Sequence, residues 1–330
     1  MDELVLILMA TYNGEKYLAE QIQSIQNQNY RDWQLIIQDD CSSDETINIL
    51  KEFAIVDKRI KYFINESKDH GAYYNFHSLA NRFKGKNEYQ YFMFCDQDDI
   101  WNPDKIEIFL NSIRDYSDIP CLVYADMSIC SADGKIIEQS MNRVFKMDHR
   151  TEYNVFFEHK VFGCNLMMNR RLFQLVPKLD LSKSYIKFLS HDNLYTKFAA
   201  TFGIIKFLPI QTMRYRRHGD NVTSHVHYKI SVIHLIKRLF EIKALAKDHT
   251  IIYNQSLVAI SLIRRIALTK EQKDRLNKIE SCIVRGGIYA IHYLNEQNIH
   301  WRRKTEEVSR RIILISGLYR QFLISDKERS

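Results

Sequence analysis

Residues 91–105 read YFMFCDQDDIWNPDK, and this stretch decides the fold. Its first four residues are apolar and mostly aromatic, which is typical of a buried strand. The run ends at three carboxylates, Asp96, Asp98 and Asp99. Ligands of open α/β sheets bind at the ends of such strands. Because Asp96 and Asp98 are two residues apart, both can reach one cation, and Mg²⁺ or Mn²⁺ on a diphosphate would satisfy them.

The same acids have a simpler interpretation as a loop that caps the next helix without a metal. Pro103 suits the first position of a helix, with Asn102 as its cap and Asp104 in the first turn. An Asp-x-Asp pattern is short, and acids are common. However, three carboxylates this close repel one another, and a bound cation relieves that repulsion. Their position behind an aromatic strand therefore favours the cation site.

Two units of the same kind precede this stretch. Each is an apolar run that ends in a polar loop, TYNG at 11–14 and DDCSSD at 39–44, and apolar residues at helical spacing follow. The predicted elements are strands at 4–9, 33–38 and 60–64 and helices at 17–25, 47–53 and 74–83. This alternation predicts an α/β fold with a parallel sheet. Two polar loops at neighbouring strand ends suit a nucleotide, although their Asp residues also fit turns and helix caps.

Length and composition limit the kinds of protein that this chain can be. The chain has 330 residues, 45% of them hydrophobic, which is ordinary for a well-packed globular protein. Its six cysteines form no CxxC pair, so we expect reduced thiols in a cytoplasm and no zinc site. The N-terminal segment carries two acids and a short apolar run, so we expect neither a signal peptide nor a membrane span.

The net charge of +7 is unevenly distributed. Residues 1–224 hold 27 Lys and Arg against 30 Asp and Glu, whereas residues 225–330 hold 20 against 10. From Lys229 onward the pattern is helical, with few glycines and no proline. One predicted apolar face consists of Val232, Leu235, Ile236, Leu239 and Ala246. Such faces usually pack on the rest of the protein, while the basic faces suit an anionic membrane leaflet or dimerisation.

Two further segments carry candidate functional groups. Asp192 follows Ser190 and His191 at the start of a predicted helix, where a carboxylate is stabilised as the anion. That placement fits a helix cap, and it equally fits a base that takes a proton from a hydroxyl. The run MRYRRHG at 213–219 concentrates positive side chains that can neutralise a departing diphosphate, with a basic exposed turn as the alternative.

Taken together, these segments resemble family 2 glycosyltransferases with the GT-A fold. The motifs that carry the resemblance are TYNG at 11–14, LIIQDDCSSDET at 35–46, DHGAYYNF at 69–76, CDQDDIWNPDK at 95–105, HDNLYTKFAATFG at 191–203 and YRRHGDNVT at 215–223. The forms DQDDIW, HD and YRxHGxN look most like bacterial rhamnosyltransferases of cell-wall and capsular polysaccharide synthesis. The resemblance implies a GT-A catalytic domain at 1–225, with a mostly parallel sheet flanked by helices, followed by a basic helical region at 226–330.

The resemblance also implies a donor site and a metal, Mn²⁺ or Mg²⁺. The residues it places around the donor are Thr11, Tyr12 and Asn13 at the nucleotide, Asp40 at the pyrimidine base, Gly71 and Asn75 along the donor, and Arg216 and Arg217 near the diphosphate. Asp96 and Asp98 would hold the metal with His218, and Asp99 would close the site toward the sugar. Cys41 stands where glycine is common, which costs on the order of 1 kcal/mol if that position has a positive φ.

On the acceptor side, the resemblance makes Asp192 the catalytic base. His191 replaces the usual Glu and is expected to orient or pack. Trp101, Gly163, Cys164 and His191 are assigned to acceptor binding, and for the 162–165 segment a purely structural turn is an equal alternative.

The sequence therefore predicts a metal-dependent inverting transferase that moves a sugar to a saccharide acceptor in bacterial surface polysaccharide synthesis. We expect L-rhamnose from dTDP-rhamnose, an acceptor linked to a polyprenyl diphosphate, and a location in the cytoplasm on the inner face of the membrane. UDP-galactose or UDP-glucose is the rival donor. A nucleic-acid-binding protein that uses the basic tail is the rival outside enzymes, but it lacks a known motif. A catalytically silent nucleotide-sugar binder is a third alternative.

Overall fold

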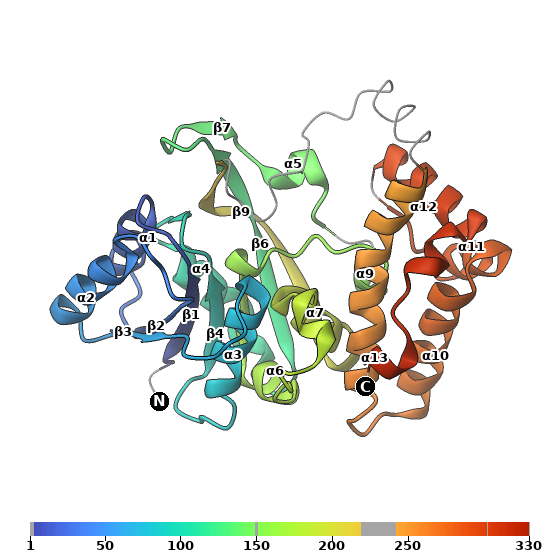
Figure 1. The fold of residues 1–330 in the computed structure, drawn as a ribbon, viewed down its shortest axis with the longest axis horizontal. Coiled ribbons are helices and arrows are strands. Elements are labelled where there is room, and N and C mark those ends of the chain that lie inside the picture. The colour runs from blue at the N-terminus through green and yellow to red at the C-terminus, as the bar shows by residue number, and fades with distance from the viewer. Residues whose placement is uncertain (1–2, 149–150, 219–241, 302, 330) are drawn as a thin grey trace.

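A computed structural model describes residues 3–148, 151–218, 242–301 and 303–329 (Figure 1). Within these residues nine strands form one sheet in the order β3-β2-β1-β4-β8-β6-β9-β5, with β7 paired to β6. The strands are β1 (Val5–Thr11), β2 (Trp33–Asp39), β3 (Ile60–Ile64), β4 (Tyr91–Cys95), β5 (Ile100–Trp101), β6 (Cys121–Cys130), β7 (Ile136–Glu138), β8 (Leu166–Asn169) and β9 (Ile204–Arg216).

The N-terminal half of the sheet has the predicted parallel topology. Strands β1 to β4 pair only in parallel with one another, and each is preceded or followed by a helix. The other half is mixed, because β8 runs antiparallel between β4 and β6 while β6 and β9 are parallel. Strand β5 pairs antiparallel with β9, so the chain after the three acids is joined to the end of β9.

Helices cover the sheet. They are α1 (Leu18–Gln26), α2 (Thr46–Val56), α3 (Ala72–Arg82), α4 (Lys105–Ile113), α5 (Met141–Phe145), α6 (Arg170–Leu175) and α7 (His191–Phe202). Short 3-10 turns are η1 (Arg114–Tyr116), η2 (Glu152–Phe156), η3 (Gly163–Asn165) and η4 (Ser184–Lys187). In Figure 1 α3, α6 and α7 lie in front of the sheet. The helix predicted to begin at Pro103 begins at Lys105, with Asp104 as its N-cap.

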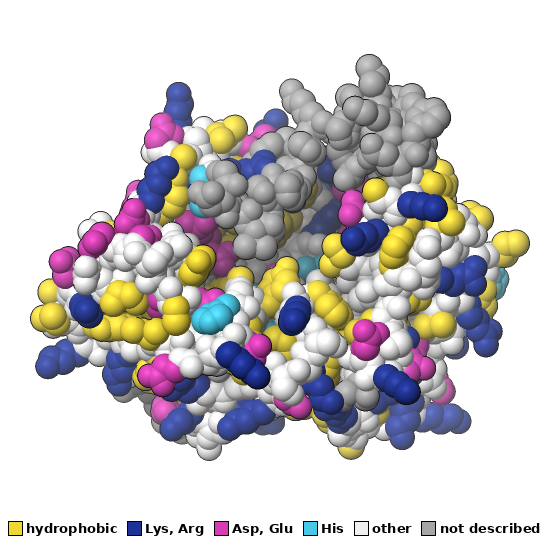
Figure 2. Space-filling model, viewed as in Figure 1, with side chains coloured by type: hydrophobic (Ala, Val, Ile, Leu, Met, Phe, Trp, Pro, Cys, Tyr) yellow, Lys and Arg dark blue, Asp and Glu magenta, His cyan; other side chains and the backbone are white. Residues whose placement is uncertain are grey.

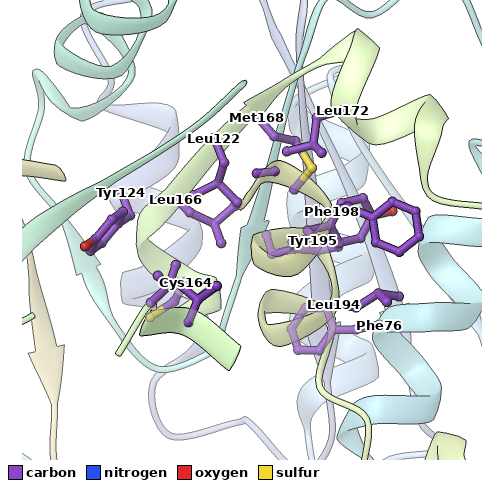
Figure 3. Packing of buried hydrophobic residues seen from close by; sticks show 14 of the residues in the cluster. Phe76, Leu122, Tyr124, Cys164, Leu166, Met168, Leu172, Leu194, Tyr195 and Phe198 are labelled. Atoms are coloured by element: carbon purple, nitrogen blue, oxygen red, sulfur yellow. The ribbon is translucent and has the colours of Figure 1, made fainter. Parts of the chain in front are cut away.

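The core explains why the site is held firmly. Every residue of 5–9 in β1 is fully buried, and Tyr91–Cys95 of β4 are at most 5% exposed. Figure 3 shows Leu194, Tyr195 and Phe198 of α7 packed beside Phe76 of α3. This apolar contact fixes the start of α7, and with it Asp192, relative to the end of β4.

The C-terminal region is helical from residue 242 onward, as predicted. Its elements are α9 (Ile242–Ile263), α10 (Lys270–Arg285), α11 (Gly287–Glu296), α12 (Lys304–Ser316), η5 (Leu318–Phe322) and α13 (Asp326–Arg329). They form a layer beside the sheet, in which α9 packs on α7 and η2 (Figure 1). Ala246 is buried. The rest of the predicted apolar face, Val232, Leu235, Ile236 and Leu239, lies outside the described residues.

The surface of this region does not form a single basic patch on the visible face. Figure 2 shows Lys and Arg side chains scattered over the C-terminal helices among acidic and polar ones. Among the described residues no helix combines the length and the apolarity that crossing a bilayer needs. The predicted division at residue 225 stays a prediction.

Candidate active site

The three acids after β4 gather at one end of the sheet, as predicted. Asp99 is 1% exposed, and its Oδ1 accepts the backbone N–H of Arg216 at 3.0 Å. Its Oδ2 is buried and has no hydrogen-bond partner among the residues that the structure describes. Asp98 Oδ2 lies 2.7 Å from Nε2 of His218. Residues 120 positions apart in the sequence therefore meet, because β5 pairs with β9.

A thiol completes the acidic cluster. One ligand atom each from Asp96, Asp99 and Cys164 lie within 4.8 Å of one another. Burial, and then the charges of Asp98 and Asp192, raise the pKa of Asp96 to about 7. Burial, followed by the charges of Asp98 and Asp96, also raises the pKa of Asp99 well above its usual value. Removing protons from such a cluster is costly, and a bound cation offsets that cost.

A buried lysine lies beneath this cluster. Lys105 is fully buried, and its Nζ donates to the Cys164 carbonyl at 2.8 Å and lies 3.9 Å from the centroid of the Trp101 ring. Burial lowers the pKa of Lys105 to about 8. Its charge, where present, lowers the pKa of both Asp96 and Asp99. Lys105 thus supplies part of the positive charge that the acids require.

Asp192 lies in the first turn of α7, on the side of the acids that faces η3. Its Oδ2 accepts the backbone N–H of Gly163 at 3.2 Å and lies 3.4 Å from Nε2 of His159. Burial raises the pKa of the Asp192 carboxyl, but His159 and His191 outweigh burial, so the pKa lies well below its usual range. The group is therefore a carboxylate at neutral pH, and its charge also acts on Asp96.

His191 is buried between aromatic rings. Its ring centroid lies 4.0 Å from that of Phe76 and 4.3 Å from that of Phe94. Burial lowers its pKa to about 4, so the imidazole is neutral at physiological pH. A Cβ on Gly163 would lie 2.2 Å from its Nε2. Gly163 is therefore glycine because the imidazole occupies the space of a side chain.

The first polar loop is tied to the second and to the acids. Thr11 donates to Asp39 at 2.8 Å, and the backbone N–H of Asn13 donates to Ser42 Oγ at 2.8 Å. The Gln97 amide accepts the Tyr12 N–H at 2.8 Å and donates to the Tyr12 carbonyl at 3.0 Å. Tyr12 itself is 58% exposed at this edge. The loop at 11–14 is thereby fixed against the loop that carries the acids.

Known proteins with a similar sequence show the family to which the chain belongs. The sequence matches the family model described as "Glycosyl transferase family 2" over residues 6–175, slightly more than half of the chain. The chain belongs to glycosyltransferase family 2. This transferase is 32% identical over 228 residues to the dTDP-rhamnosyl transferase RfbG of Shigella flexneri, which covers 67% of this chain and 75% of the relative. It is 26% identical over 165 residues to the putative teichuronic acid biosynthesis glycosyltransferase TuaG of Bacillus subtilis, and the alignment covers 50% of this chain and 61% of the relative.

Solved structures show the fold of the transferase. S. aureus TarS 1–349 in complex with UDP-GlcNAc superimposes with a TM-score of 0.56 at 16% identity, covering 98% of this chain and 85% of that one. The mannosyltransferase PcManGT from Pyrobaculum calidifontis, in complex with GDP-Man and Mn²⁺, superimposes with a TM-score of 0.50 at 12% identity, covering 96% and 86%. The predicted GT-A fold is confirmed, with a mixed rather than mostly parallel sheet.

The predicted donor residues of the transferase divide into two groups. Tyr12, Asn13 and Gly71 are exposed, whereas Thr11 is 1% exposed and its hydroxyl donates to Asp39. Figure 2 shows acidic side chains in a recess near the centre of the visible face. Asp40 is 5% exposed, and it accepts from Asn65 at 2.6 Å and from the Gly71 N–H at 2.7 Å and lies 2.9 Å from Nδ1 of His70. It therefore orders the loop at 65–71, which the sequence motifs did not indicate.

Three other predicted residues lie behind the surface of the transferase. Asn75 is 1% exposed and donates to the Gln38 carbonyl at 2.8 Å. Trp101, which was assigned to the acceptor, is 3% exposed, and its backbone N–H donates to the hydroxyl of Ser24. Arg216 is 2% exposed, and its guanidinium donates to the carbonyls of Asp98 and Ala132 and to Glu20. This geometry favours support of the acid loop over direct donor contact for these three side chains.

Arg217 and Cys41 complete the comparison with the sequence. Arg217 is half-buried, and its N–H donates to the Cys130 carbonyl at 2.9 Å. Cys41 has a φ of 62°, so the condition under which a cysteine at this position costs strain energy is met. His159, Gln97 and Lys105 were not predicted, since each acts through contacts between distant parts of the chain.

Proposed function

We propose that this transferase is metal-dependent and moves L-rhamnose, with inversion, from dTDP-rhamnose to a saccharide acceptor carried on a polyprenyl diphosphate. The observation that supports the chemistry is the meeting of two groups at one end of the sheet. One group is the crowded set Asp96, Asp98 and Asp99, and the other is the ionised Asp192, whose charge acts on Asp96. An electrophile held by a cation and a base beside it are the two requirements of inverting transfer.

The residues at the acidic cluster fit a divalent cation. Asp99 keeps a buried oxygen without a hydrogen-bond partner among the described residues, and burial together with the charge of Asp98 raises the pKa of Asp96 to about 7. Asp96, Asp98 and Asp99 would supply the oxygen ligands that Mn²⁺ or Mg²⁺ prefers, and His218 would supply a nitrogen. When bound, the cation stabilises the charge that develops on the leaving diphosphate.

The chain's own residues carry out the remaining chemistry. Asp192 takes the proton of the acceptor hydroxyl, whose oxygen attacks the anomeric carbon as the bond to the diphosphate breaks. The Gly163 N–H keeps one oxygen of the carboxylate in place at 3.2 Å. His191, neutral and flanked by Phe76 and Phe94, forms the wall behind Asp192. Buried, ionised and held on a rigid helix, Asp192 needs little reorganisation to act as the base.

The choice of sugar rests on relatives. The identity to a dTDP-rhamnosyl transferase supports rhamnose. A glucosyltransferase of Campylobacter jejuni named for a polyprenyl-diphosphate acceptor, GalNAc(5)-diNAcBac-PP-undecaprenol, is 33% identical over 93 residues, 28% of this chain and 29% of that protein. Its name supports a lipid-linked acceptor and also glucose as the rival sugar. The teichuronic acid relative supports a place in bacterial surface polysaccharide synthesis.

A donor screen tests this proposal. Nucleoside diphosphate release is measured with dTDP-rhamnose, UDP-galactose, UDP-glucose and UDP-N-acetylglucosamine, each with Mn²⁺ and with EDTA, and water serves as the acceptor. We expect release from dTDP-rhamnose in Mn²⁺ and little in EDTA. If nucleoside diphosphate is released only from a UDP-sugar, that sugar nucleotide is the donor and dTDP-rhamnose is not. Equal release in Mn²⁺ and in EDTA would refute the proposed metal dependence.

The C-terminal helices supply a surface for the proposed membrane location. Apolar side chains on them are exposed, among them Ile288 at 84% and Ile315 at 56%, and Arg285 lies over the Tyr289 ring at 5.4 Å. Docking on an anionic leaflet and dimerisation both fit these features. Flotation with anionic and with neutral liposomes separates the two, because only docking carries the protein upward with anionic vesicles.

A further inference from the structure

His159 is a buried imidazole whose position the reaction residues alone do not explain. It lies in the loop at 157–162 between η2 and η3, and its side chain is 13% exposed. Its Nε2 lies 3.4 Å from Oδ2 of Asp192. Both ring nitrogens are buried without a hydrogen-bond partner in the part of the chain that the structure describes. Buried polar atoms are usually paired, so an imidazole placed this way against a carboxylate has a use beyond packing.

The Asp192 carboxylate is held from two other directions. The Gly163 N–H donates to Oδ2 at 3.2 Å, and the Asn193 N–H donates to Oδ1 at 2.7 Å. Oδ2 therefore lies between a backbone donor and the His159 ring. The His159 ring, at 3.4 Å, therefore closes the third side of the carboxylate and leaves it little room to rotate.

The loop at 157–162 is anchored by the C-terminal helices. Lys160 lies 2.6 Å from Glu158 and 3.0 Å from Glu306 of α12. Arg310 of α12 donates to the Phe157 carbonyl at 3.4 Å. These side chains are largely buried, with exposed fractions of 12% for Lys160, 4% for Glu158 and 21% for Glu306. An ion pair with so little solvent is strongly directional, so α12 determines where the loop lies.

We propose that His159 is a positioning residue for Asp192, and that α12 places it there through Lys160 and Glu306. The inference rests on the proposed role of Asp192 as the base. The His159 ring, 3.4 Å from Oδ2, limits the rotation of the carboxylate and keeps it directed toward the acceptor hydroxyl.

Other charged and titratable groups also face this pair. Those whose charge acts on Asp192 or on which Asp192 acts are Tyr73 and His77 of α3, Asp96 of the acid loop, and His191 and Lys197 of α7. Those in or beside the 157–162 loop are Glu158, Lys160, Glu306 and Arg310. Because several groups act on Asp192, only substitution of His159 itself assigns the positioning role to this side chain.

Two substitutions at one position provide the activity test. His159→Gln retains a side-chain N–H donor without a titratable charge, whereas His159→Ala retains neither. In dTDP-rhamnose hydrolysis at pH 7.5, we expect His159→Ala to lower kcat about 10- to 100-fold with little change in KM. We expect His159→Gln to recover most of that kcat. A wild-type kcat for His159→Ala, or no recovery in His159→Gln, would overturn the proposal.

The anchoring by α12 has its own test. Glu306→Gln should lower kcat several-fold without changing donor binding, because the 157–162 loop loses its partner on α12. Arg264→Gln is the matched control, since it breaks the ion pair of Arg264 with Glu280 at 2.6 Å, which joins the end of α9 to α10. Equal kcat values for Glu306→Gln and the wild type would refute the role of α12.

A measurement without turnover separates this inference from the proposed function. In protein labelled with ¹⁵N-histidine, the imidazole ¹⁵N resonances of His159 are recorded by NMR in the wild type and in Asp192→Asn. We expect the Nε2 resonance to shift when the carboxylate beside it is replaced by an amide. An unchanged resonance overturns the contact. If Asp192→Asn shows this shift but hydrolyses the donor normally, the proposed base fails while the contact stands; if Asp192→Asn is inactive but the His159 variants match the wild type, only the inference fails.

Discussion

Gly163→Ala offers a sharp test of the acceptor side, because the structure leaves no room for the added methyl group. The new Cβ would lie 2.2 Å from Nε2 of His191 and 3.0 Å from its Cε1. Carbon and nitrogen atoms in contact need about 3.5 Å, so the imidazole or the loop must move by roughly 1 Å. His191 cannot swing away easily, since Phe76 and Phe94 lie 4.0 Å and 4.3 Å from its ring.

The expected cost has two parts. Overpacking of this kind destabilises by about 1–3 kcal/mol, measured as the free energy of unfolding in denaturant. Displacement of the Gly163 N–H from Asp192 by about 1 Å should lower kcat about 100-fold, while donor affinity stays unchanged. The double variant Gly163→Ala/His191→Ala creates the missing space and should recover much of the stability relative to the sum of the single variants. Wild-type stability and turnover for Gly163→Ala would refute the reasoning.

Two further predictions concern the charged groups. Asp192→Asn should retain the fold and donor binding, seen by calorimetry, but lose nearly all donor hydrolysis; activity near the wild-type level would remove Asp192 from the role of base. Because the folded pKa of Asp96 is about 7 and therefore above its unfolded value, the metal-free protein should lose about 4 kcal/mol of unfolding free energy as pH rises from 4 to 8. Asp96→Asn should flatten this dependence, and an unchanged slope in denaturant titrations would contradict the assignment.

The parts of the fold that follow local patterns could be predicted from the sequence. Strands β1 and β4 are continuous apolar runs closed by polar loops, so their existence and the placement of Asp96 at a strand end follow from the residues. The antiparallel insertion of β8 could not be predicted, because the four residues 166–169 carry no signal of strand direction. The direction of β8 depends on its pairing with β4 and β6, which lie far from it in the sequence.

The site divides in the same way. Asp192 could be placed at a helix start from its local sequence, whereas its partner His159 is 33 positions away and belongs to a loop held by α12. The joining of Asp98 to His218 depends on the pairing of β5 with β9, which no local pattern specifies. Arg216 was predicted from its charge to meet a diphosphate, but charge alone does not show that its guanidinium is enclosed by protein acceptors.

The claim that the acids after β4 hold a cation on the donor diphosphate is tested most directly by calorimetry with dTDP. Its affinity is measured in Mn²⁺ and in EDTA, for the wild type and for Asp98→Ala. The account predicts binding at least about tenfold tighter in Mn²⁺ for the wild type, which is about 1.4 kcal/mol, and loss of most of that difference in Asp98→Ala. Equal affinity in Mn²⁺ and in EDTA, or an undiminished Mn²⁺ effect in Asp98→Ala, would contradict it.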